Sequence, residues 1–180
     1  MQRFIEPLGS SELVRKVRLF IASSLDGYIA REDGSVDWLF SDADYGYSEF
    51  YGSIDTLVMG RKTYEKSLEF EEHPFRGKKV YVFSRSVKKK KGVEFVSDVI
   101  SFMKRLVRSK GKNIWLVGGS EIVSVFLNEG LIDETIVSIH PVILGEGIPL
   151  FKNVQKEVWL SLQKSVSFDS GLVQIHYTVR

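Results

Sequence analysis

The chain has no cysteine, and this absence excludes disulfide bonds, thiolate catalysis and cysteine zinc sites. Histidine is also scarce: His73, His140 and His176 lie far apart and show no metal-ligand spacing. We therefore expect no metal site. His140 comes just before Pro141 and is interpreted as structural. A chain without cysteine is compatible with a reducing cytoplasm, which is the expected location.

Long apolar runs and an excess of one charge are absent as well. No apolar stretch approaches the roughly 20 residues of a membrane span, and the first residues lack the apolar core of a signal peptide. The formal net charge of +2 is too balanced to indicate nucleic-acid binding. The basic run Lys88–Lys91 is interpreted as a solvated turn. We expect neither membrane nor nucleic acid as a partner.

What is present is typical of a globular protein. The chain has 180 residues, of which 43% are hydrophobic and 27% charged, and this length suits one domain with a sizeable core. We expect an N-terminal extension over residues 1–16 and a single domain over residues 17–180.

Apolar patterning predicts strands that alternate with helices and are then followed by further strands. The expected strands are Val17–Ala22, Asp55–Met59, Lys79–Ser84, Val93–Val96, Asn113–Val117, Glu134–Leu144, and a hairpin of Val158–Ser167 with Leu172–Val179. The expected helices are Asp42–Ser53, a short one that Gly60 opens, Asp98–Ser109 and Ser120–Asn128. This order predicts an α/β fold with a mainly parallel sheet, an antiparallel C-terminal edge and helices on both faces.

The segment Ile114–Glu121, IWLVGGSE, is a buried strand that runs into a glycine pair and opens a helix. Glycines permit close approach to the main chain, and free N–H groups at a helix start attract anions, above all phosphate. The spacing differs from the dinucleotide fingerprint G-x-G-x-x-G, so a tight turn with nothing bound is the alternative.

Two other strand exits carry groups of the same kind. Gly60–Thr63 places a glycine, two cations and a hydroxyl at a helix start, and Ser84 and Arg85 follow the next strand. Ligands of open α/β sheets bind at the carboxyl ends of the strands. The presence of such groups after three separate strands predicts phosphate binding more strongly than any one of these strand ends alone.

The residues resemble the dihydrofolate reductase superfamily, in particular the branch around the riboflavin-biosynthesis reductase domain (RibD C-terminal domain). The resemblance runs from about Val17 to the C-terminus. It is carried by ASSLDGYIA (22–30), DTLVMGRKTYE (55–65), YVFSRS (81–86), WLVGGSE (115–121) and HPVILGEGIPLF (140–151). It implies a three-layer fold of dihydrofolate reductase type and an NADPH-dependent reductase.

The resemblance also implies a cofactor site, with a non-standard peptide at the glycine pair. The residues that would hold the 2′-phosphate and its neighbouring phosphates are Arg61, Lys62, Thr63, Ser84 and Arg85, at and after the Gly60 turn. Those that would cradle the pyrophosphate are Val117, Gly118, Gly119, Ser120 and Glu121. Ala22 and Ile29 would flank the nicotinamide, and the loop from Ser23 to Trp38 would act as a lid.

The catalytic acid is the open point. Folate reductases carry a carboxylate on the helix before the MGR motif, and counting back from Gly60 places Asp44 there. An ordinary surface aspartate is the alternative. Asp26 in the lid is a second candidate, although Asp-Gly is equally a plain turn.

The sequence leaves the substrate and the partner as hypotheses. A ribosylaminopyrimidine phosphate and a dihydrofolate or related pterin are the two substrate candidates, and a non-catalytic nucleotide-binding module is the alternative of another class. The resemblance and apolar residues of the C-terminal third (Val142, Ile148, Leu150, Phe151) predict a homodimer.

Overall fold

The computed structural model describes residues 14–71, 74–86 and 91–180. His73, Lys88–Lys90 and residues 1–13 of the expected extension lie outside this part of the chain. The strands are β1 (Val17–Ser24), β2 (Tyr28–Ala30), β3 (Ile54–Gly60), β4 (Lys79–Phe83), β5 (Val93–Val96), β6 (Asn113–Gly118), β7 (Glu134–His140), β8 (Ile148–Pro149), β9 (Leu160–Ser167) and β10 (Val173–Val179). The helices are α1 (Tyr47–Gly52), α2 (Arg61–Phe70), α3 (Val99–Leu106) and α4 (Ser120–Asn128).

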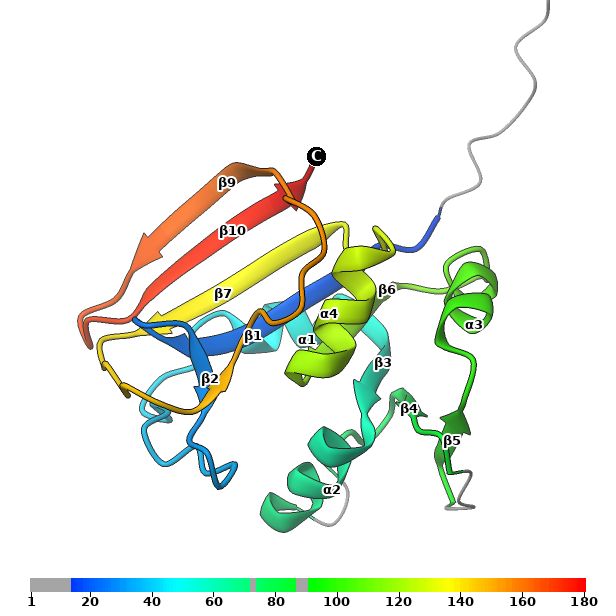
Figure 1. Ribbon diagram of the computed structural model, residues 1–180, viewed down its shortest axis with the longest axis horizontal. Coiled ribbons are helices and arrows are strands. Elements are labelled where there is room, and N and C mark those ends of the chain that lie inside the picture. The colour runs from blue at the N-terminus through cyan, green and yellow to red at the C-terminus, as the bar shows by residue number, and fades with distance from the viewer. Residues whose placement is uncertain (1–13, 72–73, 87–90) are drawn as a thin grey trace, which may run out of the picture.

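The main sheet has eight strands in the order β5-β4-β3-β6-β1-β7-β10-β9 (Figure 1). Every neighbouring pair from β5 to β7 is parallel, whereas β10 runs antiparallel to both β7 and β9. The predicted parallel sheet with an antiparallel C-terminal edge is therefore confirmed. The parallel arrangement brings the carboxyl ends of β4, β3, β6, β1 and β7 to one edge.

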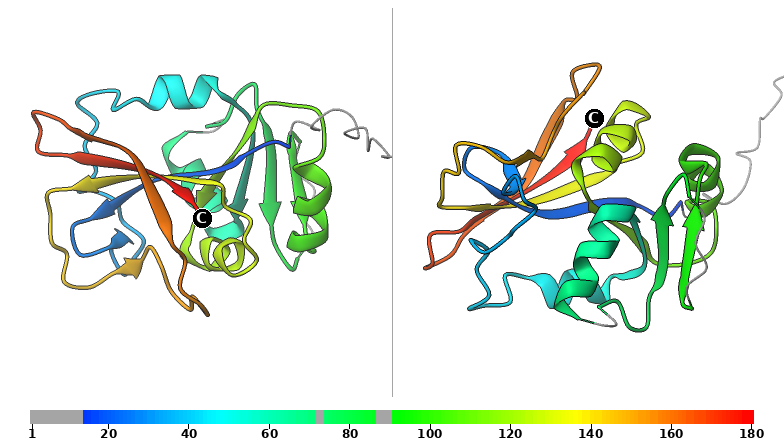
Figure 2. Two further views of the ribbon diagram at one scale, coloured as in Figure 1. Left: turned by 90° about the horizontal axis from the view of Figure 1, so that it is seen from above. Right: turned by 60° about the horizontal axis from the view of Figure 1, so that its bottom comes forward.

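Helices cover both faces of the sheet, so the three-layer prediction is also confirmed (Figure 2). Because side chains alternate along a strand, neighbouring residues of β1 belong to different cores. Leu19 packs in a cluster with the apolar residues of α3 and α4. Phe20 packs against the opposite cluster, to which α1 contributes Phe50 and α2 contributes Tyr64.

The largest differences from the sequence prediction are two element boundaries and one small sheet. The first helix begins at Tyr47 rather than Asp42, because Tyr45 and Gly46 adopt positive φ values of 50° and 77° that no right-handed helix contains. Strand β7 ends at His140 rather than Leu144, since Pro141 has no N–H group to continue the ladder. The small sheet of β2 and β8 was not predicted, and its strands are too short for a periodic pattern.

The described end of the extension is bound to the domain. Arg15 is 4% exposed, and its guanidinium donates to Asp55, to Thr56 Oγ1 at 2.6 Å and to Ser109 Oγ at 3.1 Å. Gly111 makes room for this network, because a Cβ there would lie 2.7 Å from Asp55 Oδ2. Arg15 thus joins β3 to the end of α3.

Within residues 14–71, 74–86 and 91–180, no helix has both the length and the apolar composition needed to cross a membrane. The same residues contain no group of three or more histidine, aspartate or glutamate side chains placed to hold a metal ion.

Candidate functional site

Two of the predicted strand exits meet at the carboxyl edge of the sheet. Helix α2 follows β3, helix α4 follows β6, and β3 pairs directly with β6. The contact is close: a Cβ built on Gly119 would lie 3.2 Å from Thr63 Oγ1. Glycine at this position therefore lets the first turns of α2 and α4 approach each other.

Both helices begin at a glycine that supplies no capping side chain. Gly60 precedes α2 and Gly119 precedes α4, and neither helix start has a side-chain cap hydrogen bond. The first N–H groups of a helix have no intrahelical acceptor and carry partial positive charge. Two such helix starts side by side form a cradle that suits a phosphate or pyrophosphate.

The glycine pair has the unusual backbone that the resemblance implied, because the Gly118–Gly119 peptide is cis. Gly118 also has a φ of 122°, and a Cβ on it would lie 3.3 Å from Ile21 Cδ1. A side chain is therefore disfavoured at this position by both conformation and space. The preceding Val117 is partly buried at the end of β6.

The side chains of Ser120 and Glu121 make contacts with residues 149 and 152, outside the glycine turn. The Ser120 hydroxyl donates to the carbonyl of Pro149, and the residue is only 4% exposed. Glu121 is exposed and lies 3.4 Å from Lys152 Nζ. The Ser120 side chain thus joins α4 to β8.

The predicted phosphate cations lie at the same edge but outside the cradle. Arg61 donates to both oxygens of Glu65 at 2.8 and 2.9 Å, one turn along α2. Lys62 and Arg85 are exposed. Ser84 donates its hydroxyl proton to Ser86 O at 2.9 Å and so forms a local turn after β4. A bound phosphate would compete with Glu65 for Arg61.

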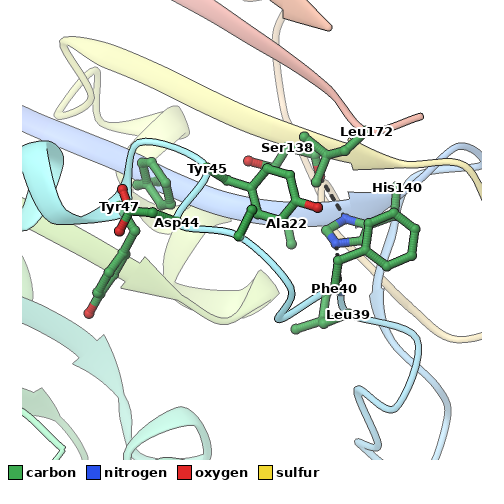
Figure 3. A pocket seen from close by; sticks show the side chains of 11 residues that line it. Ala22, Leu39, Phe40, Asp44, Tyr45, Tyr47, Ser138, His140 and Leu172 are labelled. Atoms are coloured by element: carbon green, nitrogen blue, oxygen red, sulfur yellow. Dashed lines mark hydrogen bonds between the residues drawn. The ribbon is translucent and has the colours of Figure 1, made fainter. Parts of the chain in front are cut away.

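A cavity of about 380 Å³ lies at the ends of β1 and β7, beside the cradle. One wall comes from these strands and the other from the segment between β2 and α1 (Figure 3). The lining residues are Phe20, Ala22, Leu39, Phe40, Ala43, Asp44, Tyr45, Tyr47, Ser138, His140 and Leu172. This lining includes several aromatic rings, one carboxylate and no lysine or arginine.

His140 closes one end of the cavity and is 4% exposed. The backbone N–H of Phe40 donates to its Nε2 at 3.2 Å, so Nδ1 carries the ring proton and faces Ser138 O at 3.3 Å. The rings of Trp38 and Phe40 lie 5.2 and 5.0 Å from the imidazole. Desolvation lowers the pKa of His140, which favours this neutral form.

The two candidate acids have different surroundings. Asp44 lines the cavity, and its carboxylate accepts hydrogen bonds from Ser48 N at 3.1 and 3.2 Å and from Ser48 Oγ at 2.6 Å. It therefore precedes α1 and binds its first turn, instead of lying on the helix as expected.

Asp26 lies in the turn between β1 and β2 and is not part of the cavity lining. Its carboxylate accepts from Ser24 Oγ at 2.6 Å, Gly145 N at 2.8 Å and Leu144 N at 3.1 Å. The Ser24 hydroxyl, followed by these amides, lowers the pKa of Asp26. Its geometry ties two loops together, and its low pKa does not suit a proton donor.

The first half of the predicted lid, residues 23–30, is attached to the segment that follows β7. Asp26 joins it to the loop after β7, and β2 pairs with β8. Ala22, expected beside the nicotinamide, does line the cavity. Ile29, expected on the other side, lies in β2 and is not among the lining residues.

Several cavity residues were not assigned from the sequence. The aromatic type of Tyr45, Tyr47 and Phe50 suits a ligand and a core equally; Tyr45 and Tyr47 line the cavity, whereas Phe50 is 4% exposed and belongs to the core. Desolvation raises the pKa of Tyr47 to about 12, so its hydroxyl stays protonated. The sequence prediction did not assign Ser138 and His140 to the site. Their position near the end of a parallel strand could have indicated it, because ligands bind at such strand ends.

The RibD C-terminal domain family model matches residues 15–174. The chain belongs to this family. The Bacillus subtilis (strain 168) protein YwjB is 44% identical over 170 residues, covering 91% of this chain and 97% of YwjB. The riboflavin biosynthesis protein RibD of Corynebacterium ammoniagenes is 25% identical over 154 residues, covering 73% of this chain and 44% of that protein.

Solved structures agree with the fold. A Shewanella sp. PV-4 protein, provisionally named for riboflavin biosynthesis, superposes with a TM-score of 0.82 at 31% identity, covering 92% of this chain and 99% of that one. A Thermotoga maritima diaminohydroxyphosphoribosylaminopyrimidine deaminase/5-amino-6-(5-phosphoribosylamino)uracil reductase gives 0.73 at 19% identity, covering 93% and 57% of the two chains. The recognised branch of the dihydrofolate reductase superfamily is confirmed.

Proposed function

We propose that the protein is an NADPH-dependent reductase that transfers hydride to a small flat heterocycle held in the cavity at the ends of β1 and β7. The observation that carries the proposal is the position of this cavity beside the glycine cradle of α2 and α4. Strand β1, whose Ala22 lines the cavity, is the direct neighbour of β6, whose end forms the cradle.

The residues present fit a dinucleotide along this edge. From β4 to β1 there are three strand spacings, about 14 Å in all, so one extended molecule can reach from Arg85 through the cradle to Ala22. The uncapped N–H groups of α2 and α4 would bind its pyrophosphate, and Arg61, Lys62 and Arg85 its 2′-phosphate. A nicotinamide cofactor supplies the hydride when bound, and the chain orients the acceptor and excludes water.

Asp44 is the residue proposed to protonate or orient the substrate. It is the one carboxylate of the cavity lining, and Ser48 holds it in place by hydrogen bonds to both carboxylate oxygens. His140 is neutral and its Nε2 is occupied by Phe40 N–H. Tyr45 and Tyr47 offer aromatic faces for a flat ring.

Two substrates follow from different observations. Membership of the RibD C-terminal domain family supports a phosphoribosylaminopyrimidine, the type of substrate named for the Thermotoga relative. The aromatic lining without lysine or arginine favours a pterin, because a buried phosphate needs cationic partners.

The test is NADPH oxidation by the purified full chain against a panel that pairs each heterocycle with its ribosyl phosphate. Turnover of at least one member supports the proposal, and the preferred half of each pair decides between the substrates. If NADPH binds but nothing in the panel is reduced, the protein is better described as a nucleotide-binding module. If NADPH does not bind at all, the proposal is wrong.

We also propose that the protein is a homodimer through its C-terminal edge. Strand β9 ends the sheet, and the nearby apolar side chains Trp159 and Leu162 are 67% and 59% exposed. Phe151 is 47% exposed, as expected, whereas Leu150 is buried at 3% and belongs to the core instead. Light scattering at micromolar concentration should give about twice the chain mass of 20.5 kDa, and a value near 20.5 kDa would refute the dimer.

A further inference from the structure

Gln174 is a polar residue of β10 that is only 4% exposed and that the proposed chemistry does not use. Both protons of its amide are engaged: Nε2 donates to Ser138 Oγ at 3.0 Å and to Tyr45 O at 3.1 Å. His176 Nε2 lies 2.9 Å from Gln174 Oε1, and since that oxygen only accepts, the imidazole nitrogen carries the proton. The buried amide is therefore fully satisfied.

These bonds join opposite walls of the cavity. Ser138 lies on β7 and is the cross-strand partner of Gln174 in the sheet register, whereas Tyr45 lies on the segment that covers the cavity. The Gln174 amide thus joins the covering segment to the sheet at Tyr45, as the Phe40 N–H bond to His140 Nε2 does at Phe40. Figure 3 shows Ser138 and Tyr45 together in the lining.

The Tyr45 turn has a conformation that needs such support. Its φ of 50° is unfavourable for a residue with a side chain, and Gly46 follows with a φ of 77°. The turn places Asp44 and Tyr47 on either side, and Tyr47 N donates to Asp44 O at 2.9 Å. Because Asp44 directly precedes Tyr45 in the chain, a shift of the Tyr45 carbonyl would also shift Asp44, the proposed acid.

We propose that Gln174 is the positioning residue of the substrate cavity: its amide fixes the Tyr45 turn and so sets where Asp44 and Tyr47 face the substrate. The kinetic part of this inference rests on the proposed reductase function, and the structural part does not. The cofactor cradle lies across the sheet edge and shares none of the Gln174 contacts.

The test uses Gln174→Met, which keeps the length of the side chain and removes the amide. Amide hydrogen exchange over residues 43–48 should become at least about tenfold faster, because the turn loses the hydrogen bond from the Gln174 amide to Tyr45 O. The KM for the heterocycle should rise at least about tenfold, since small misplacements of binding groups are costly. The dissociation constant for NADPH should stay within about twofold of the wild-type value.

The variant Gln174→Glu tests whether the amide matters as a hydrogen-bond donor or only through the volume of the side chain. A carboxylate keeps the shape and can accept from Ser138 and His176, but it cannot donate to Tyr45 O. The Gln174→Glu variant should show the same faster amide exchange and the same higher KM. If Gln174→Met does not fold, Gln174→Glu replaces it in the test.

Thr135→Val is the matched control. Thr135 is also buried, on β7, but among the described residues its hydroxyl has no hydrogen-bond partner. This variant should leave both the exchange of residues 43–48 and the KM unchanged. Wild-type exchange over residues 43–48 in both Gln174 variants overturns the inference, as does an unchanged KM in an active enzyme. If the wild type reduces no heterocycle, the proposed function fails and the exchange experiment alone decides.

Discussion

The proposed cofactor cradle and the proposed substrate cavity lie side by side at one edge of the sheet but are built in different ways. The cradle consists of backbone and glycine at the ends of β3 and β6, within short sequence motifs. The cavity consists of side chains from four distant segments, around Phe20, Phe40, Ser138 and Leu172. A site made of backbone is recognisable from local sequence, whereas a site made of distant side chains depends on the complete fold.

The two regions also differ in the contacts that keep their residues in place. The cradle needs only that α2 and α4 approach, which Gly119 allows. The cavity needs a chain of hydrogen bonds from Gln174 through the Tyr45 turn to Asp44 and Ser48. We therefore expect single substitutions in the cradle to act on cofactor binding alone, and those in the cavity to act on the KM for the heterocycle or on turnover.

The largest expected effect is that of Gly119→Val on the cradle. A Cβ at this position already lies 3.2 Å from Thr63 Oγ1, and the two further methyl groups would fill the space where a pyrophosphate approaches the backbone. NADPH affinity, measured by calorimetry, should fall at least about 10²-fold in a folded protein. Gly52→Val is the control, because nothing lies within 4 Å of a Cβ there. Normal binding by the Gly119 variant would mean that the glycine pair is only a turn.

Asp44→Asn tests the cavity side of the comparison. If Asp44 protonates or orients the substrate, turnover should fall by about 10² or more while the NADPH dissociation constant is retained. Asp26→Asn serves for comparison, because that carboxylate binds the loop amides of Leu144 and Gly145. It should lower the thermal midpoint more than the turnover. Unchanged turnover with Asn at position 44 would contradict the role assigned to Asp44.

Smaller effects are expected for the cations at the rim of the cradle. Charge-assisted bonds to phosphate contribute about 1.5–3 kcal/mol each, so Arg85→Ala should weaken NADPH binding roughly 10- to 150-fold and leave NADH binding nearly unchanged. Arg61→Ala should cost less, because Arg61 must first leave its pair with Glu65. Equal wild-type dissociation constants for NADPH and NADH would contradict the assignment of both arginines.

The smallest effect concerns pH and the neutral His140. Because desolvation lowers its pKa in the folded state, the unfolded chain binds a proton below about pH 6.5 that the folded chain does not. The contribution of His140 to stability should therefore be constant above this pH and decrease as pH falls below it. The loss between pH 7.5 and 5.5, measured by urea unfolding, should be smaller in His140→Gln. Desolvation also lowers the pKa of His176, so His176 accounts for part of the stability loss that remains in the variant. Equal losses of stability in wild type and variant would contradict the prediction.

The sequence predicted most of the fold because its signals are local. Seven strands of the main sheet and the helix Ser120–Asn128 were placed to within two residues, since each has a continuous or alternating apolar pattern bounded by glycine or polar residues. The start of α1 was missed because the left-handed conformation of Tyr45 has no composition signal. The β2–β8 pair was missed because pairing between segments more than 100 residues apart leaves no local pattern.

The sequence by itself determined the order of the helices and of the main-sheet strands, the glycine cradle and the cations beside it, because backbone conformation and strand ends depend on neighbouring residues. Only the tertiary structure decided which side chains form the cavity. It placed His140 and Ser138 in the lining, Asp26 in a loop contact and Ser120 against Pro149, because these positions follow from strand register and crossover connections. The Gln174 amide belongs to the same class, since its partners lie 36 and 129 residues away along the chain.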